Sequence, residues 1–474
     1  MPKFLGRNEE LQRLNEAIQK KSASFIVIKG RRRIGKSRLV QEFSKSFEHF
    51  YSFTALPPDT TTTRQHQLNE FCRQLAQNFK TPVAQYNDWG DAFLALAERV
   101  KHGKILLFFD EISWMGGLDP SFLGKIKNLW DLNLKSNPKL VFIICGSASA
   151  WIEKNIMSGA GFVGRISFTI TLRELPMSDC FLFWPKNISI YEKIKVLAVT
   201  GGVPKYLEEI NPKISAEENI KKLCFTEGGL LVEEYRHIFS DIFLRESQFY
   251  DKITHILAEG AKELEEIQEK IGIKIIGRLS EYLWELELAG FITRDYTWNI
   301  KTGADSKLSK YRLSDNYLRF YLKYIEKNRD KMKRGSFNLK SFSSLPEWNQ
   351  MMGLQFENLL LHNRAKIHKM LGLQAIDIIC DNPYFQRKTQ RYSGCQIDYL
   401  IETKFNTLYI CEFKFSKNLI GNSVIEEIQK KINCLPNHNK FSCRPVLIHV
   451  NGVQKELLES DFFTAVIGIE ELFA

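Results

Sequence analysis

One feature constrains the fold of this chain more than any other, the loop GRRRIGKS at Gly30 to Ser37. The loop matches the pattern G-x-x-x-x-G-K-[ST] without a gap. The apolar run SFIVI before it predicts a buried strand, and SRLVQEF after it predicts a helix. Backbone N–H groups of such a strand, loop and helix converge on phosphate oxygens. A chance glycine-rich turn is the alternative, but the flanking elements favour a phosphate loop in an α/β domain.

The residue types within the loop indicate how it would hold a nucleotide. Lys36 is predicted to reach the β- and γ-phosphates, and the Ser37 hydroxyl is predicted to ligate Mg²⁺. The predicted nucleotide-binding set comprises Gly30, Arg31, Arg32, Arg33, Ile34, Gly35, Lys36, Ser37 and Arg38. Phosphate binding alone does not explain three consecutive arginines. Contact with DNA, with a neighbouring subunit or with acidic residues of a lid would each fit.

Two later strands end in side chains that suit nucleotide hydrolysis. The run ILLFFDE ends with Asp110, predicted to hold Mg²⁺, and Glu111, predicted to polarise the attacking water. A strand that merely ends in an acidic turn is the alternative. The run LVFIICGS ends at Ser147, which is predicted to contact the γ-phosphate, although serine is also common where strands end.

The order of apolar and helical patterns predicts several domains. A chain of 474 residues is too long for one hydrophobic core. Strand-like runs alternate with helical ones up to Leu172, which indicates a parallel sheet covered on both faces. We expect an α/β chain with a P-loop core at 1–172, a helical lid at 173–245, a winged helix at 246–325, a linker at 326–346 and an α/β domain at 347–474.

Charge and cysteine usage bound the partners and the compartment. A net charge of +11 favours an anionic partner such as nucleic acid, although a solvated basic surface fits equally well. The nine cysteines are scattered singly, and no apolar run reaches membrane length. Reduced thiols, a cytoplasmic location and no membrane association are therefore expected. No zinc-protease or serine-elbow motif occurs.

Residues 259–296 predict a helix, a turn and a second amphipathic helix, followed by a β-hairpin that would form a wing. The candidate DNA contacts are Lys274 and Arg278 on the second helix and Lys301, Lys307 and Lys310 in the wing. The same helix carries Glu281, Glu285 and Glu287, which would repel DNA. A packing module that never touches DNA is therefore the alternative.

The C-terminal part predicts a second chemical site, on a hairpin within GCQIDYLIETKFNTLYICEFKFS. Asp398 lies on the first strand, and Glu412 and Lys414 share one face of the second, because strand side chains repeat every two residues. The carboxylates would bind Mg²⁺ and activate water, and the lysine would stabilise charge on a phosphodiester. Glu357, on the helix before the hairpin, is a further candidate metal ligand. A surface ion pair is the alternative.

Four more polar residues flank this hairpin. Gln429, in the following helix, is predicted to orient water or substrate. Three basic residues before the hairpin are predicted to follow a phosphate backbone, with a solvated loop as the alternative: Arg387, Lys388 and Arg391.

Seven segments follow one another in the order and spacing of a known family: FLGRNEEL, GRRRIGKS, ILLFFDEISWM, CGSAS, VGRISFTITLREL, TGGVPKYL and YRLSDNYLRFY. Over nearly its whole length the chain resembles prokaryotic archaeal-type ATPases, which are related to AAA+ and STAND NTPases. The resemblance implies an ATPase core with a lid, a winged helix and a C-terminal domain like PD-(D/E)XK restriction endonucleases. It places Gly6 and Arg7 at the adenine, and it implies that Arg165 reads the γ-phosphate in cis or across a subunit boundary. The arginines of the loop belong to the family's motif.

These observations predict an ATP- and Mg²⁺-dependent ATPase that couples its nucleotide state to nucleic acid, most simply DNA, with metal-dependent phosphodiester cleavage by the C-terminal domain. The alternative is a STAND-type switch with a C-terminal domain that binds without cleaving. A third hypothesis is a DNA-binding protein that uses ATP only as a structural ligand. An Arg165 acting across a subunit boundary would require a homo-oligomer.

Overall fold

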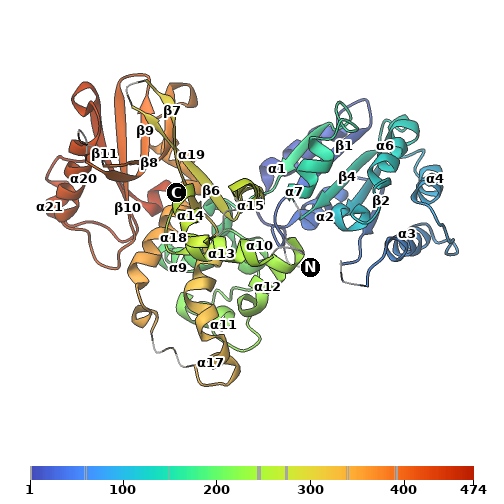
Figure 1. Cartoon of the computed structure of the whole chain (residues 1–474), viewed down its shortest axis with the longest axis horizontal. Coiled ribbons are helices and arrows are strands. Elements are labelled where there is room, and N and C mark those ends of the chain that lie inside the picture. The colour runs from blue at the N-terminus through green and yellow to red at the C-terminus, as the bar shows by residue number, and fades with distance from the viewer. Residues whose placement is uncertain are drawn as a thin grey trace.

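The computed structural model describes residues 3–57, 59, 61–147, 149–242, 247–272, 276–300, 302–337, 339, 341–388, 390 and 393–473. An N-terminal sheet lies at one end of the molecule and a C-terminal sheet at the other, with helices and a β-hairpin between them (Figure 1). This arrangement confirms the predicted α/β class. Among the described residues, no helix is long and apolar enough to cross a membrane.

The N-terminal sheet has the strand order β2-β3-β4-β1-β5, and every neighbouring pair is parallel. Its strands are β1 (Ser24–Lys29), β2 (His49–Thr54), β3 (Ile105–Asp110), β4 (Val141–Gly146) and β5 (Phe168–Thr171). The central strands read as unbroken apolar runs because helices cover both of their faces.

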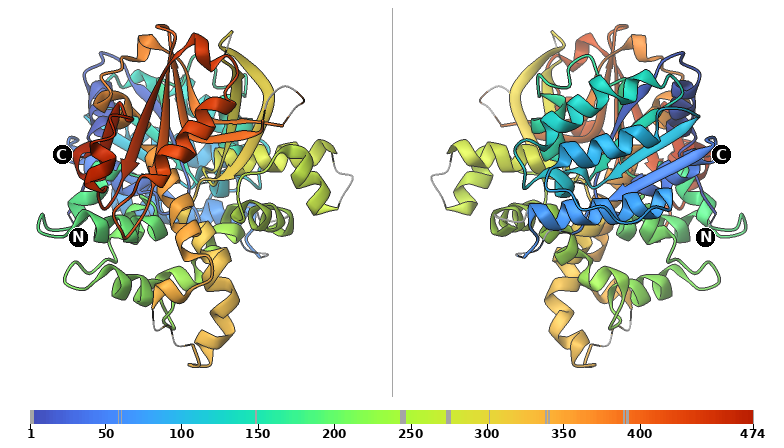
Figure 2. Two further views of the ribbon diagram at one scale, coloured as in Figure 1. Left: turned by 90° about the vertical axis from the view of Figure 1, so that its left-hand side faces the viewer. Right: turned by 90° about the vertical axis from the view of Figure 1, so that its right-hand side faces the viewer.

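Two separate cores pack on this sheet. The helices α1 (Asn8–Ile18) and α2 (Lys36–Ser44) contribute to the core on one face. The core on the other face contains α3 (Arg64–Phe79), α4 (Trp89–Arg99) and α6 (Phe122–Leu132), and the right-hand view of Figure 2 shows α3 and α4 in front of the sheet. Short helices follow strands β3 and β4, namely α5 (Ile112–Gly116) and α7 (Ser149–Ile152), and a π-helical turn (Glu153–Met157) continues α7.

A helical layer follows β5, within the segment 173–245 for which the sequence analysis expects a lid. It contains α8 (Met177–Cys180), α9 (Ile190–Thr200), α10 (Pro204–Leu207), α11 (Ala216–Cys224) and α12 (Leu230–Ile242). We call this layer the lid. One continuous hydrophobic core joins it to the C-terminal part, with Leu197, Tyr317, Phe356 and Ile448 among its buried members.

The next segment has the predicted helices and hairpin. They are α13 (Ser247–Ala258), α14 (Leu264–Ile271), α15 (Ile276–Leu288) and the antiparallel strands β6 (Ile292–Asn299) and β7 (Ala304–Leu313). After α16 (Asn316–Phe320), residues 326–346 contain α17 (Arg329–Lys333) and two short 3-10 helices (Glu326–Asn328 and Phe342–Ser344), and Met332 and Phe342 are buried. This predicted linker therefore packs against the rest of the protein.

The C-terminal sheet has the order β12-β11-β10-β9-β8, with β8, β9 and β10 antiparallel and β10, β11 and β12 parallel. Its strands are β8 (Ile378–Gln386), β9 (Cys395–Thr403), β10 (Thr407–Lys414), β11 (Ser442–His449) and β12 (Ala465–Gly468). The surrounding helices are α18 (Trp348–His362), α19 (Arg364–Met370), α20 (Ser423–Cys434), α21 (Lys455–Leu458) and α22 (Ile469–Leu472).

The hairpin β6–β7 packs against this sheet, and the left-hand view of Figure 2 shows the two side by side. The Trp298 indole N–H donates to Glu402 Oε2 at 2.5 Å, and its ring meets Tyr384 edge-on at 5.4 Å. Asn382 Nδ2 donates to the Tyr296 carbonyl at 2.9 Å. The hairpin that the sequence assigns to a wing is thus bound to its own C-terminal domain.

Candidate functional site

The phosphate loop joins β1 to α2 at the carboxyl end of the parallel sheet, where ligands of α/β folds bind. A Cβ at Gly30 would lie 2.4 Å from the Leu172 carbonyl oxygen, so that only glycine fits there. Gly35 has φ +92°, a left-handed conformation that also favours glycine. The two glycines of the motif therefore have separate steric causes.

A cavity of about 540 Å³ opens over this loop, within the range of ~300–1,000 Å³ that is typical of small-ligand sites. Its lining includes Arg7, Glu111 and these residues of the predicted nucleotide-binding set: Arg32, Arg33, Ile34, Gly35, Lys36, Ser37 and Arg38. The lining also includes residues that sequence reasoning missed: Phe4, Leu5, Trp114, Phe183, Pro204 and Lys205. Single aromatic residues in separate segments give no periodic signal, and only the fold brings them together.

The lysine of the loop bonds to backbone carbonyls, and the serine bonds to a carboxylate. Lys36 donates to the carbonyl oxygens of Gly30 and Arg31 at 2.8 and 3.0 Å. Ser37 Oγ donates to Asp110 Oδ2 at 2.6 Å, and Asp110 is buried. A hydroxyl beside a buried carboxylate suits a hard divalent cation such as Mg²⁺. The structure thus brings the two predicted Mg²⁺ residues together.

Glu111 and Ser147 contact each other. Glu111 lines the cavity and has φ 53°, a left-handed conformation. Its Oε2 accepts hydrogen bonds from the backbone N–H and the hydroxyl of Ser147, each at 3.0 Å. Ser147 is buried and is not among the residues that line the cavity. In this conformation Ser147 holds the Glu111 carboxylate, whereas the sequence analysis predicted contact with the γ-phosphate.

Arg7 connects the N-terminus to the loop and to the lid. Its guanidinium donates to the Ile34 carbonyl at 3.1 Å and to the Arg173 carbonyl at 2.5 Å, and its backbone N–H donates to Asp179 Oδ2 at 3.1 Å. Gly6 packs against Asp179 and does not line the cavity.

Arg165 lies outside the cavity lining. Its guanidinium makes a two-pronged ion pair with Asp131, with Nε 2.9 Å from Oδ1 and NH2 2.8 Å from Oδ2. The structure therefore does not bring Arg165 to the phosphate loop, and its action across a subunit boundary stays a prediction.

The arginine run makes contacts within this chain. The Arg31 side chain is only 4% exposed and forms an ion pair with Asp315, at the start of α16. It also lies 3.5 Å from Glu174 Oε1, and its guanidinium lies over the Phe291 ring at 5.1 Å. Of the three partners considered for the arginine run, namely DNA, a neighbouring subunit and acidic residues of the lid, these contacts agree best with acidic residues.

Arg33 also pairs with a buried acid, in this case on α12. Its Nε lies 2.5 Å from Oε1 of Glu234, a carboxylate that is fully buried. Tyr206 connects the two arginines, because its hydroxyl accepts from Arg31 at 3.3 Å and donates to Glu234 at 3.1 Å. The phosphate loop is therefore joined to the lid by two buried charged contacts.

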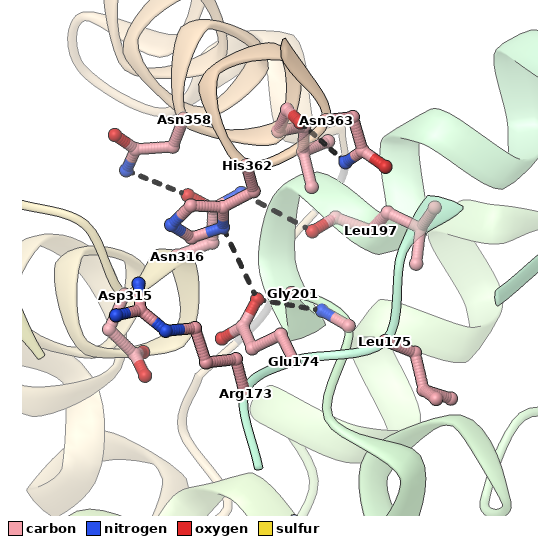
Figure 3. A network of polar contacts seen from close by, with 12 residues as sticks. Arg173, Glu174, Leu175, Leu197, Gly201, Asp315, Asn316, Asn358, His362 and Asn363 are labelled. Carbon is pink, nitrogen blue, oxygen red and sulfur yellow. Dashed lines mark hydrogen bonds and ion pairs between the residues drawn. The ribbon is translucent and has the colours of Figure 1, made fainter. Parts of the chain in front are cut away.

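Glu174 extends these contacts to the C-terminal part of the chain (Figure 3). Its carboxylate accepts from the Gly202 N–H at 2.9 Å and lies 3.8 Å from His362 Nδ1, at the end of α18. Burial lowers the pKa of His362. The next residue, Asn363, accepts from the Met177 N–H of the lid at 3.0 Å. The end of α18 therefore contacts the segment that holds Arg31.

The three predicted residues of the C-terminal hairpin lie together. Asp398 Oδ2 accepts from the backbone N–H of Phe413 at 2.9 Å, and Lys414 Nζ lies 3.1 Å from Glu412 Oε1. Sequence reasoning missed Lys431, whose Nζ lies 2.5 Å from Glu412 Oε2 and 3.9 Å from Asp398 Oδ1. We call Asp398, Glu412, Lys414 and Lys431 the C-terminal cluster.

The charges of the C-terminal cluster shift one another's protonation. Burial and the nearby charge of Glu412 raise the pKa of Asp398 to about 8, against the lowering effect of Lys431. Burial also raises the pKa of Glu357, and the Glu412 charge adds to this effect. Within the described residues, no three His, Cys, Asp or Glu side chains converge as a metal site, so Glu357 does not complete a triad with Asp398 and Glu412.

The remaining predicted contacts lie elsewhere. Gln429 donates to Asn433 on the surface of α20, and Arg387 forms an ion pair with Glu263 of the preceding segment. Lys388 lies just after β8, and Arg391 falls outside the described residues.

The predicted DNA-reading helix, α15, packs against the ATPase core. Lys154 Nζ lies 2.6 Å from Glu281 and 2.9 Å from Glu285, and it sits over the Trp284 ring at 5.4 Å. In the hairpin, Lys310 Nζ lies over the Phe385 ring at 4.7 Å. Of the other candidate DNA contacts, Arg278 lies on α15 and Lys307 on β7, whereas Lys274 and Lys301 fall outside the described residues.

The Arg31–Asp315 pair gives a direct test of this arrangement. Arg31→Met should lower the free energy of unfolding by about 3–5 kcal/mol, because it leaves a buried carboxylate without its cation. Asp315→Asn retains the acceptor that caps the Leu318 N–H. The double variant Arg31→Met/Asp315→Asn should recover most of the loss in urea unfolding. Strictly additive losses would show that the two charges do not interact.

Comparison with known proteins agrees with this geometry. Residues 4–210 match the sequence profile of a family described as "ATPase domain predominantly from Archaea". The chain is 28% identical over 368 residues to "Uncharacterized protein MJECL04" of Methanocaldococcus jannaschii. The aligned part covers 77% of this chain and 78% of the relative.

Two solved structures align with most of this chain. The Walker-type ATPase PABY2304 of Pyrococcus abyssi aligns with a TM-score of 0.50 and 17% identity, over 67% of this chain and 96% of that one. The Aeropyrum pernix ORC2 protein, solved in ADPNP–ADP complexes, aligns with a TM-score of 0.44 and 12% identity, over 71% and 96%. Residues 4–210 are thus similar to an ATPase domain that is found predominantly in Archaea.

Proposed function

We propose that this ATPase uses Mg²⁺ at the phosphate loop and couples its nucleotide state to a C-terminal domain that binds nucleic acid and cleaves phosphodiesters with a second Mg²⁺. The observation that carries the proposal is the chain of contacts from the phosphate loop to α18, which runs from the buried Arg31 through Glu174 to His362. Without it, the two sites would be independent. The net charge of +11 supports an anionic partner.

At the phosphate loop, each step falls to a described residue. Lys36 exchanges the carbonyl oxygens of Gly30 and Arg31 for the β- and γ-phosphate oxygens when ATP enters. Ser37 and Asp110 would hold Mg²⁺, which neutralises charge on the phosphates. Glu111 leaves Ser147 and accepts a hydrogen bond from the attacking water.

The two sites are coupled through the Arg31 peptide group, whose carbonyl Lys36 leaves when ATP binds. The carbonyl of Arg31 binds Lys36, while the Arg31 side chain is held by Asp315 and Glu174. A shift of this peptide on ATP binding therefore acts on a side chain that is buried and ion-paired at its far end. Glu174 in turn contacts His362 on α18.

The helix α18 reaches the second site. Glu357, on the same helix as His362, senses the charge of Glu412 in the C-terminal cluster. There, Asp398 and Glu412 would hold Mg²⁺, which activates a water for attack on phosphorus. Lys414 would stabilise the negative charge that develops on the phosphodiester. The carboxylates fit a cation, because they already share the ammonium group of Lys431.

Replacing the predicted water-polarising residue tests the ATPase chemistry. Glu111→Gln should slow ATP hydrolysis by about 10²–10⁴-fold, because the amide cannot take the proton of the attacking water. ATP affinity should stay near that of the unchanged protein, since the loop is intact. Phosphate release and fluorescent-nucleotide titration measure the two effects. Unchanged hydrolysis would favour ATP as a structural ligand only.

A substitution in the C-terminal cluster tests nucleic-acid cleavage. With Mg²⁺ or Mn²⁺ and ATP, the unchanged protein should nick labelled single-stranded, duplex or branched DNA. Glu412→Gln should abolish nicking and leave ATP hydrolysis intact. The matched control is Glu427→Gln, which removes the other carboxylate on Lys414, a half-exposed one. If the control loses nicking equally, the assignment to Glu412 is wrong.

A second candidate function has a specific observation in its favour. The helix α15 is docked on the ATPase core through Lys154, and the hairpin is docked on β8. Both elements act here as packing modules, as expected of a STAND-type switch in which ATP changes conformation or assembly. In that case the C-terminal domain binds a partner without cleaving, and no DNA is nicked by the unchanged protein. Arg165 would then act in a homo-oligomer after leaving Asp131.

A further inference from the structure

Lys431 is the member of the C-terminal cluster that has no part in the proposed cleavage reaction. It lies on α20, and its ammonium contacts both carboxylates, at 2.5 Å from Glu412 Oε2 and 3.9 Å from Asp398 Oδ1. Lys414 is placed differently. It contacts the other oxygen of Glu412, at 3.1 Å, and turns toward Glu427 on the surface, at 2.7 Å.

The two carboxylates need a cation between them. The Glu412 side chain is 5% exposed and that of Asp398 is 20% exposed, so that water screens their mutual repulsion poorly. Two nearby carboxylates without a counter-ion cannot both remain ionised at low cost. The ammonium of Lys431 occupies the position from which one positive charge serves both.

Glu357 of α18 is a third carboxyl group that interacts with this region. Its side chain is half-buried, and its charge interacts with that of Glu412. The structure gives it no hydrogen bond or ion pair with any described residue. Among the described residues, Lys431 and Lys414 are therefore the cations in direct contact with the carboxylates of the cluster.

We propose that Lys431 is a built-in counter-ion that occupies the metal position between Asp398 and Glu412, so that a divalent cation must displace its ammonium to bind. This inference rests on the proposed metal site. It makes Lys431 a positioning residue that controls metal loading, distinct from Lys414, which can stay on the outer oxygen of Glu412 when a cation is bound.

The arrangement also explains how the metal-free protein remains stable. Lys431 keeps the carboxylates paired until a cation replaces it, and a flexible side chain can then leave without unfolding α20. Removing the ammonium should therefore have two opposite effects. The metal-free protein becomes less stable, and the affinity for a divalent cation rises, because the cation no longer competes with a charge of the protein itself.

Mn²⁺ binding to the full-length, nucleotide-free protein tests the proposal, with free Mn²⁺ measured by electron paramagnetic resonance. Lys431→Met keeps the aliphatic stem and removes the charge. It should bind Mn²⁺ at least about tenfold more tightly than the unchanged protein, which corresponds to about 1.4 kcal/mol. The matched control is Lys430→Met, which removes the same charge from the exposed neighbouring position and should leave the affinity unchanged.

Glu412→Gln is also made, both in the unchanged protein and in Lys431→Met. The Mn²⁺ that these variants still bind is held elsewhere, for example beside Asp110, and is subtracted. If binding depends on Glu412 but is no tighter in Lys431→Met, the counter-ion role is wrong and the metal site stands. If no variant shows Mn²⁺ binding that depends on Glu412, the metal site itself is wrong, and the inference with it.

Thermal unfolding tests the proposal even if a variant folds poorly without metal. Saturating Mn²⁺ should raise the Tm of Lys431→Met, and of Lys431→Gln measured beside it, by more than it raises that of the unchanged protein. An equal or smaller rise in both variants, or failure of both to fold even with Mn²⁺, would overturn the proposal.

Discussion

The buried guanidinium of Arg31 is the interaction on which the arrangement of the molecule depends. A buried charge is costly unless its partners are fixed in position, and Arg31 has Asp315 and Glu174 as partners and the Phe291 ring against its face. These partners come from the lid and from segments well beyond it. The phosphate loop is therefore a structural centre of the chain as well as a nucleotide-binding element, and a change in its conformation has to be accommodated elsewhere.

The helix α18 is the element through which such a change would reach the C-terminal domain. Its end contacts Glu174 through His362. Its middle is held by a buried polar network in which Asn358 contacts Arg312, and Arg312 is paired with Asp295 at 2.7 Å. Such a network is satisfied in one geometry and costly in others, so α18 should move as a unit. A helix that moved as a unit between two positions would meet the physical requirement for coupling between distant sites.

Local sequence predicted the parts of the sites that are local in structure. A strand, a glycine-rich loop and a helix specify the position of Lys36, and alternation along β10 places Glu412 and Lys414 on one face. The partners of Arg31 and Arg165 were beyond prediction, because no periodicity reports which distant acid a charge will meet. Lys431 was missed for a related reason, since the sequence of α20 does not fix how the helix docks on the sheet.

The hairpin β6–β7 shows that one sequence pattern is compatible with either of two roles, a DNA-binding wing or a packing element. Alternation and turn residues predict two paired strands, and the strands form as expected. Whether the hairpin meets DNA or protein depends on its surroundings, and here Trp298 finds an acceptor in Glu402 and an aromatic partner in Tyr384. The same holds for α15, where Lys154 pairs with Glu281 and Glu285.

Amide hydrogen exchange of the full chain, with and without a non-hydrolysable ATP analogue and Mg²⁺, tests most directly whether the phosphate loop is coupled to the C-terminal domain. Coupling should alter the protection of α2 and also of α16 and α18, which do not line the nucleotide cavity. Changes confined to the segments that line the cavity, with α16 and α18 exchanging as before, would contradict it.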